Sequence, residues 1–155
     1  MKKLLSLISA FTLSFTLSHA VAATPQAYDE SADAKTAITK ALAEAKTSDK
    51  KVLVIFGANW CKDCLELDKS MKGQSAPLLA SKFVTVKVNV GQFDKNMDLS
   101  AAYGTPTKKG IPAAVLLRPD NSVLYASKGG ELSNARKMSE QGVYDFFDEI
   151  TALYH

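Results

Sequence analysis

The sequence predicts a single α/β domain with a mixed β-sheet and helices on both faces. Three observations lead to this prediction: apolar runs over 52–56 and 83–90 that helical patterns separate, an apolar run over 113–117 followed by turn residues, and an amphipathic stretch near the C terminus. A chain of 155 residues, 46% hydrophobic and 23% charged, has the length of about one domain and an ordinary globular composition. This composition excludes a disordered, collagenous or multi-span protein.

Residues 1–22 have the features of a secretory signal peptide. The chain begins with Met1 and two lysines, continues with an apolar stretch over 4–17 interrupted only by Ser and Thr, and reaches small residues up to Ala22. A membrane anchor is the alternative, but about 14 apolar-leaning residues are fewer than the roughly 20 that a span requires. We expect cleavage after Ala22, a periplasmic or other extracytoplasmic location, and no membrane span in the mature chain.

The net charge gives no reason to expect a nucleic-acid or anionic-lipid partner. The full chain has 19 Lys and Arg against 16 Asp and Glu, a net charge of +3. Without Lys2 and Lys3 of the leader, 17 basic residues remain against 16 acidic ones, and the mature chain carries +1. A closed zinc site would need all of the 2 cysteines and 2 histidines. Because His19 lies in the leader and His155 is the last residue, no metal site is predicted.

The first half of the domain reads as a helix followed by a buried strand. After a polar segment over 23–30, which we expect to be flexible, apolar residues recur at helical spacing over 34–45 and predict an amphipathic helix that ends near Thr47. The run over 52–56 is apolar throughout, which is typical of a strand covered on both faces, as in a parallel sheet. Gly57 ends this strand.

A second helix–strand unit follows. The pattern predicts a helix over 61–71, a further turn over 75–79 and a second buried strand over 83–90. The polar segment over 91–110 is the least regular part of the chain, with a short helix expected over 97–103.

The C-terminal part reads as a hairpin and a closing helix. The apolar strand over 113–117 is followed by turn residues at 119–121, and residues 122–127 pair back as the second arm. Gly129 and Gly130 end the sheet. A closing helix is predicted to cover one sheet face with an apolar stripe of Val143, Phe146, Phe147, Ile150 and Leu153.

The chemistry of the sequence is concentrated in a Cys-x-x-Cys pair, Cys61 and Cys64. Cys61 falls at the start of the predicted helix, where unpaired backbone N–H groups and the helix dipole favour a thiolate. The sulfurs at positions i and i+3 can face one another and close a small disulfide. An exposed Cys61 would attack a partner's disulfide, and a buried Cys64 would then release the mixed intermediate.

Two other uses of the pair stay open. An inert structural disulfide is one, although closing so short a loop adds only roughly 2 kcal/mol to the free energy of unfolding. Copper(I) handling is the other, because two thiolates can hold this ion. Met71, Met97 and Met138 are scattered, so no Met-rich tract supports the copper reading. A non-catalytic binding module for a thiol-containing or copper-loaded partner is the corresponding alternative to an enzyme.

Several motifs in order resemble the thioredoxin superfamily. These are the segment over 52–64 with Trp60 directly before Cys61, the Gly-Ile-Pro sequence at 110–112 before an apolar strand, and the closing helix. The match covers roughly residues 51–153, and the leading helix is similar to that of small secreted proteins of the disulfide-isomerase type. The resemblance implies a thioredoxin fold over 31–155: a central mixed β-sheet flanked by helices, with an extra N-terminal helix.

The resemblance also implies roles for residues beside the dithiol. Pro112 would follow a cis peptide bond, which costs only about 0.5 to 1 kcal/mol for an X-Pro pair, and would expose the backbone of Ile111 so that a substrate chain can pair with it. Trp60 would shield the dithiol and offer an apolar contact to substrates. Lys62 should favour the Cys61 thiolate and Asp63 should oppose it, so both would tune the site.

Two departures from the superfamily pattern limit what the resemblance implies. Many members have a buried acid six residues before the first cysteine, where this chain has Ile55. Proton transfer at Cys64 must then use water or another group, with Asp63 and Glu66 the nearest acids in sequence. The second departure is a longer segment over 91–109, which is either a place for partner selection or a tolerated insertion.

The sequence therefore predicts a periplasmic thiol:disulfide oxidoreductase with Cys61 as nucleophile and Cys64 as resolving thiol. Reductases, isomerases and oxidases share these parts. An Ile directly before the proline, here Ile111, is similar to the pattern of the reductive thioredoxins and favours reduction or isomerisation. No cofactor is expected, because the dithiol itself carries the electrons. The expected partners are protein substrates with thiols or disulfides and a redox partner that recycles the dithiol. A monomer is expected.

Overall fold

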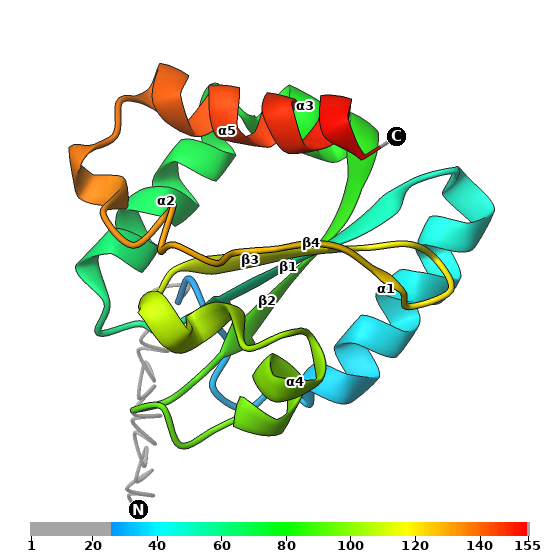
Figure 1. Cartoon of the computed structure of the whole chain (residues 1–155), viewed down its shortest axis with the longest axis horizontal. Coiled ribbons are helices and arrows are strands. Elements are labelled where there is room, and N and C mark those ends of the chain that lie inside the picture. The colour runs from blue at the N-terminus through cyan, green and yellow to red at the C-terminus, as the bar shows by residue number, and fades with distance from the viewer. Residues whose placement is uncertain (1–25, 155) are drawn as a thin grey trace, which may run out of the picture.

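The computed structural model describes residues 26–154, so the predicted signal peptide over 1–22 and His155 lie outside the described residues. A mixed four-stranded sheet of order β2-β1-β3-β4 forms its centre (Figure 1). The strands are β1 (Lys51–Gly57), β2 (Phe83–Asn89), β3 (Ala113–Leu117) and β4 (Val123–Ala126). β1 pairs parallel with β2 and antiparallel with β3, and β4 completes an antiparallel hairpin with β3. The predicted mixed sheet is confirmed.

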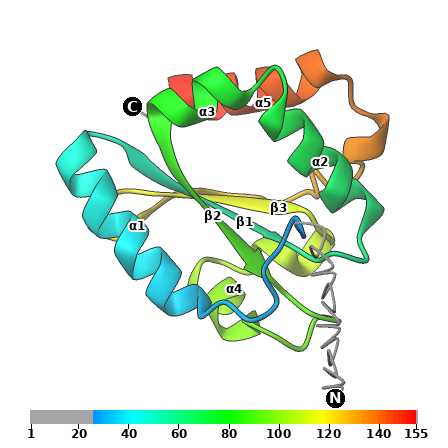
Figure 2. The same cartoon turned by 180° about the vertical axis from the view of Figure 1, so that it is seen from behind.

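Helices cover both faces of this sheet, as predicted. α1 (Ala34–Ser48) lies on one face, with α4 (Met97–Ala102) near its start, and α2 (Lys62–Lys72), α3 (Ala76–Lys82) and α5 (Glu140–Leu153) lie on the other (Figures 1 and 2). Two short 3-10 helices, η1 (Pro106–Lys109) and η2 (Ala135–Lys137), complete the described elements. Within residues 26–154 no helix is long and apolar enough to cross a membrane.

β1 is buried along almost its whole length, because it has a neighbour on each side and helices on each face. Its residues 52–56 are all 0% exposed, which explains why this run shows no alternation of apolar and polar side chains. β2 lies at an edge, and the buried strand predicted over 83–90 is buried only in part. Val86 and Val88 are buried, whereas Thr85 is exposed and Lys87 is only half-buried.

The closing helix buries most of its predicted stripe. Val143, Phe147 and Ile150 are buried, and Phe146 packs edge-on against Tyr125 of β4 at 6.0 Å between ring centroids. The prediction is wrong for Leu153, which is 64% exposed. The helix ends at this residue beside the edge strand β4, so the last turn has no further strand to cover.

Residues 26–30 are the described part of the segment that the sequence predicts to be flexible, and Tyr28 joins them to the rest of the fold. Tyr28 is 1% exposed and is tied to the loop after β1 through Asn59. The Tyr28 N–H donates to Asn59 Oδ1 at 3.0 Å, and Asn59 Nδ2 donates to the Tyr28 carbonyl at 2.8 Å. The Tyr28 ring packs on Gly57, where a Cβ would overlap it. This segment therefore supports the loop that leads to the dithiol.

Candidate active site

Cys61 and Cys64 form a disulfide at the N terminus of α2, directly after β1 and a three-residue loop. Cys61 is the N-cap of α2, and its Sγ accepts a hydrogen bond from the Cys64 backbone N–H at 3.1 Å. The Cys61 N–H in turn donates to the Ala58 carbonyl at 3.2 Å, which closes the loop. The sulfur of Cys61 therefore lies at the positive end of the helix dipole, as the sequence predicts.

The two cysteines differ in exposure less than the sequence predicts. Cys64 is 0% exposed, as expected of a resolving thiol, but Cys61 is only 6% exposed, so the prediction of an exposed nucleophile is wrong for the disulfide form. The carbonyl oxygen of Ile111 lies 3.6 Å from Cys61 Sγ and covers part of it. A disulfide sulfur carries no proton, so this approach is a van der Waals contact rather than a hydrogen bond.

The Ile111–Pro112 peptide bond is cis, and both residues are buried. η1 leads into this segment, and Gly110, which precedes it, has φ 112°, a value that favours glycine. The structure thus brings together four of the predicted site residues, namely Cys61, Cys64, Ile111 and Pro112. The backbone of residue 111 contacts the Cys61 sulfur through its carbonyl oxygen.

Trp60 forms an exposed aromatic pair with Phe93, a residue that the sequence analysis did not single out. Trp60 is 49% and Phe93 43% exposed, with ring centroids 6.0 Å apart and planes at 61°. The indole N–H of Trp60 donates to the Gly91 carbonyl at 2.7 Å, which fixes the ring over the start of the longer segment. Phe93 has φ 63°, a left-handed conformation that a bulky side chain adopts only at a cost. A single Phe in a polar segment carries no periodic signal.

Asp63 is engaged by η2 rather than left to solvent. Its Oδ1 accepts a hydrogen bond from the Arg136 N–H at 2.9 Å and pairs with Arg136 Nε at 3.2 Å. Burial raises the pKa of Asp63, but the contacts with Arg136 outweigh it and hold this pKa below its ordinary value of 3.8. Lys62 is exposed. Arg136 forms an ion pair with Asp63 and so reduces the effect of the Asp63 charge on Cys61. The roles of Lys62 and Asp63 in tuning the site stay predictions.

The acids named as possible proton acceptors for Cys64 both form ion pairs, and neither has a described contact with Cys64. Asp63 binds Arg136, and Glu66 has a side chain 41% exposed that pairs with Lys69 at 3.3 Å. Ile55 lies six residues before Cys61, where many members of the superfamily have an acid. It is fully buried and has no ionisable group. α2 carries a buried acid that the sequence analysis missed, Asp68, although its position four residues after Cys64 places it on the same stripe of the helix.

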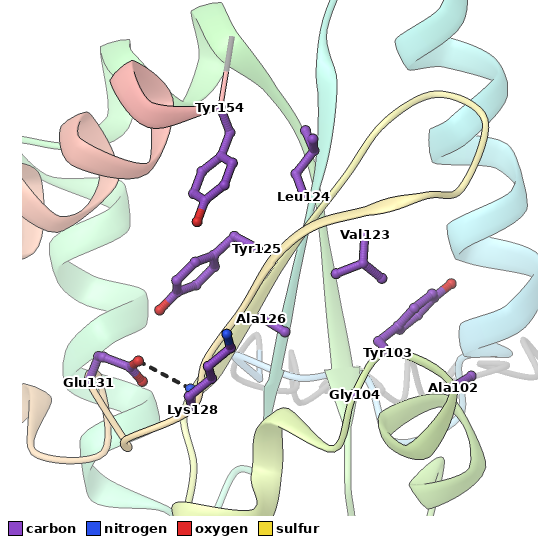
Figure 3. Close-up of a pocket in the computed structure, with 10 residues that line it drawn as sticks. All are labelled: Ala102, Tyr103, Gly104, Val123, Leu124, Tyr125, Ala126, Lys128, Glu131 and Tyr154. Atoms are coloured by element: carbon purple, nitrogen blue, oxygen red, sulfur yellow. Dashed lines mark hydrogen bonds between the residues drawn. The ribbon is translucent and has the colours of Figure 1, made fainter.

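Another part of the longer segment, Ala102, Tyr103 and Gly104, lies beside a hollow on the sheet. A hollow of about 440 Å³ runs along β4 and is bordered by the rings of Tyr103, Tyr125 and Tyr154 (Figure 3). Tyr103 donates from its hydroxyl to Asn121 Oδ1 at 3.0 Å, in the turn between β3 and β4. None of the predicted site residues lines this hollow. Gly91 and Phe93 of the longer segment contact Trp60, the residue before Cys61.

Possible metal ligands are few in the described part of the chain. Residues 26–154 contain no group of three or more His, Cys, Asp or Glu side chains placed to hold a metal ion. The sulfurs of Cys61 and Cys64 are the adjacent pair of soft donors, and in the structure they bind one another.

The chain is similar to redox proteins by sequence and by structure. A family model described as thioredoxin-like matches residues 33–119. A thioredoxin of Buchnera aphidicola is 35% identical over 89 residues, which span 57% of this chain and 73% of that protein. The crystal structure of a disulphide isomerase from Xylella fastidiosa is 55% identical, with a TM-score of 0.81 over 83% of this chain and 99% of that one. A thioredoxin from Thermus thermophilus shares the fold, with 21% identity and a TM-score of 0.52 over 73% of this chain and 80% of that one.

Replacing Asp63 with Asn should destabilise the protein by about 1 kcal/mol at neutral pH, because Arg136 loses a charged partner. The folded pKa of Asp63 lies below 3.8. Its contribution is therefore fully present above the unfolded pKa and is lost as the pH falls through the lower folded pKa. Urea unfolding of D63N and wild type should show a difference at neutral pH that closes in acid.

Glu66→Gln is the matched control, since Glu66 lies on the same helix but is more exposed, and it should change the free energy of unfolding less. A loss in D63N that is equally large in acid would show that Asp63 acts through packing rather than through its charge.

Proposed function

The chain belongs to the thioredoxin-like family and is a thiol:disulfide oxidoreductase, and we propose that it acts in the periplasm as a reductase or isomerase of protein disulfides. The observation that carries this proposal is the dithiol itself: Cys61 caps α2, while Cys64 is buried one turn further on. This geometry gives the two sulfurs different tasks, because Cys61 keeps 6% exposure at the start of the helix, whereas Cys64 is fully buried behind it.

In the reductive direction, the Cys61 thiolate attacks a substrate disulfide. A bond forms between Cys61 Sγ and one substrate sulfur, and the other substrate sulfur leaves as a thiolate. The Cys64 thiolate then attacks Cys61 Sγ, which forms the Cys61–Cys64 disulfide and releases the second substrate sulfur. Two electrons pass to the substrate, and a redox partner must reduce the dithiol again. In isomerisation another substrate thiol attacks the mixed disulfide, so Cys61 leaves reduced and no net electrons are transferred.

The helix terminus assists both directions. When Cys61 is a thiolate, the Cys64 N–H that reaches its Sγ in the structure and the dipole of α2 both stabilise the negative charge. The same groups make Cys61 a good leaving group when Cys64 attacks. We assign the nucleophilic step to Cys61 and the resolving step to Cys64 on this basis.

Two surfaces beside Cys61 are suited to hold a substrate chain. The backbone at Ile111 lies in contact with the Cys61 sulfur, so an extended chain that pairs there brings its own sulfur to the reactive atom. The aromatic pair of Trp60 and Phe93 offers apolar surface that the fold leaves uncovered. We therefore assign it to contacts with the apolar side chains of partly folded substrates.

Reduction or isomerisation is favoured over oxidation by the relatives and by one residue. Two of the proteins named above support this direction, the Buchnera thioredoxin and the Xylella disulphide isomerase. Ile111, directly before the cis proline, is the residue that led the sequence analysis to the same direction.

The leader supports a periplasmic location. Residues 1–22 have the order of a signal peptide, with cleavage expected after Ala22. The mature chain, which we expect to be a monomer, would then meet folding proteins in a compartment where disulfides form.

Equilibration of the mature protein against glutathione buffers should give a reduction potential between about −270 and about −180 mV, the range from thioredoxin to protein disulfide isomerase. A potential near about −120 mV would identify an oxidant and overturn the proposed direction. A cysteine pair that does not equilibrate with glutathione would instead support an inert structural disulfide.

Replacing Cys64 with Ser should make mixed disulfides accumulate in cells, because the resolving attack is lost while Cys61 can still react. The trapped proteins are identified from the periplasmic fraction by non-reducing electrophoresis and mass spectrometry, where the chain should begin at Ala23. The double variant Cys61→Ser, Cys64→Ser is the control and should trap nothing.

A chain that traps no partner would be a binding module rather than an enzyme. A copper carrier would bind a single copper(I) ion per reduced protein and lose it when either cysteine is replaced. Trapped chains that keep the leader and stay in the cytoplasm would overturn the location.

Replacing Phe93 with Ala should lower kcat/KM for a disulfide-linked peptide with Trp or Phe beside its cysteine by about fivefold, equivalent to about 1 kcal/mol. Reduction of glutathione disulfide, which lacks such a side chain, should change little. Leu65→Ala is the matched control, since Leu65 is 42% exposed on α2 but does not belong to the aromatic pair. Equal losses for both substrates would show that Phe93 acts on the dithiol rather than on substrate selection.

A further inference from the structure

Asp68 is a buried charge that the dithiol chemistry described above does not use. Only 9% of this residue is exposed, and it is the only acidic residue of the described chain, 26–154, that is so deeply buried. Its carboxylate pairs with Lys87 of β2 and with Lys72 Nζ at 2.8 Å. Burying such a pair brings little net stability, because apolar side chains of similar size commonly do as well. The pair therefore calls for a role other than holding α2 on the sheet.

Asp68 lies one helical turn beyond Cys64 on the same buried stripe of α2. Side chains at i and i+4 of a helix are neighbours, with Cβ atoms about 5–6 Å apart. A carboxylate extends further than its Cβ and so can reach the Cys64 thiol directly or through one water molecule. Cys64 itself is 0% exposed, so bulk water does not reach its sulfur.

Lys87 pairs with Asp68 and lies opposite Ile55, the position where the superfamily pattern has an acid. Lys87 is in register with Ile55 across the parallel pair of β2 and β1, so both side chains point to the face that α2 covers. Ile55 offers no proton acceptor there. Asp68 brings a carboxylate to this face from the helix, and Lys87 meets it from the strand.

Two adjacent cations oppose the effect of burial on Asp68. The groups that face it are the ammonium groups of Lys72 and Lys87, and an adjacent cation favours a carboxylate. The phenol of Tyr28 lies beyond Lys87, whose Nζ is 5.8 Å from the ring centroid, and burial raises the pKa of this tyrosine, so it stays neutral. α3 contributes only apolar side chains to this region, Ala76 and Leu79.

A hollow of about 460 Å³ borders Asp68 and Lys87 and also includes Lys72 and Thr85, both of which are exposed. Water can therefore reach the outer side of the ion pair, although it does not reach Cys64. A proton that arrives on Asp68 has a way out to solvent.

We propose that Asp68, held in place by Lys87, accepts the proton of the Cys64 thiol when Cys64 resolves the mixed disulfide. The proton moves from Cys64 Sγ to an Asp68 carboxylate oxygen, and the resulting thiolate attacks Cys61 Sγ. The bond between Cys61 and the substrate sulfur breaks, and the substrate leaves as a thiolate. Asp68 then gives its proton to water in the adjoining hollow. In the oxidative direction the same proton returns to Cys64. The inference rests on the proposed function and names the base for its second step.

The test measures the two thiol steps separately in the mature reduced protein. A limiting amount of dithiobis(nitrobenzoate) releases a coloured thiolate first when Cys61 attacks and again when Cys64 attacks the mixed disulfide. In stopped-flow absorbance the first phase depends on concentration and the second does not. Asp68→Asn should slow the second phase at least about tenfold at neutral pH, in line with the loss of a general base, and leave the first within about twofold. Towards about pH 10 the second phase should return to the wild-type rate, because the thiol then loses its proton unaided.

Lys87→Met is the second variant and covers the case in which D68N does not fold. It should slow the second phase in the same direction by a smaller factor, because Asp68 loses the cation that orients it. Glu66→Gln is the matched control on α2 and should leave both phases unchanged. A second phase that keeps the wild-type rate in D68N and K87M, or that slows by the same factor at every pH, would overturn the inference. Absence of the second phase in the wild-type protein would instead overturn the proposed function.

Discussion

Burial of β1 on all sides is the constraint on which the rest of the structure depends. Strands flank it on both edges and helices cover both faces, so the five residues 52–56 are fully buried. Its C-terminal end therefore has a well-defined position, and the short loop that follows delivers Cys61 to the start of α2. Tyr28 packs on Gly57 and binds Asn59, which secures this loop from the other side. The dithiol is thus held by the core rather than by a surface loop.

The parts of the fold that could be predicted from the sequence are those with a local pattern. The apolar run of β1, the helical spacing of α1 and the turn between β3 and β4 are each visible within a few residues, and the structure confirms them. The dithiol and the Gly-Ile-Pro segment were likewise found by short motifs. The contact of Cys61 with the Ile111 carbonyl, fifty residues away, needed the superfamily resemblance as well, because spacing alone does not bring these segments together.

The parts that could not be predicted depend on partners far apart in the chain. Asp63 reads as a solvated neighbour of Cys61 until Arg136 is placed against it by η2. Phe93 reads as a lone aromatic residue until Trp60 meets it across the loop. Asp68 reads as a surface acid of a polar helix, and only the pairing of β1 with β2 puts Lys87 opposite it. In each case the missing information is a tertiary contact.

The burial of the Cys64 sulfur and the placement of the Asp68–Lys87 ion pair are connected. A partner's sulfur must not reach Cys64, or the order of attack would be lost, and complete burial of Cys64 achieves this. The same burial keeps bulk water from its proton, so a resolving thiol that is well protected is also one that is hard to ionise. A base inside the protein removes this conflict, but a lone buried carboxylate would be strongly destabilising. Lys87 offsets that cost by pairing with Asp68. In this view the buried ion pair is a consequence of hiding the second cysteine, and its place beside α2 rather than on β1 leaves Ile55 free to be part of the apolar core.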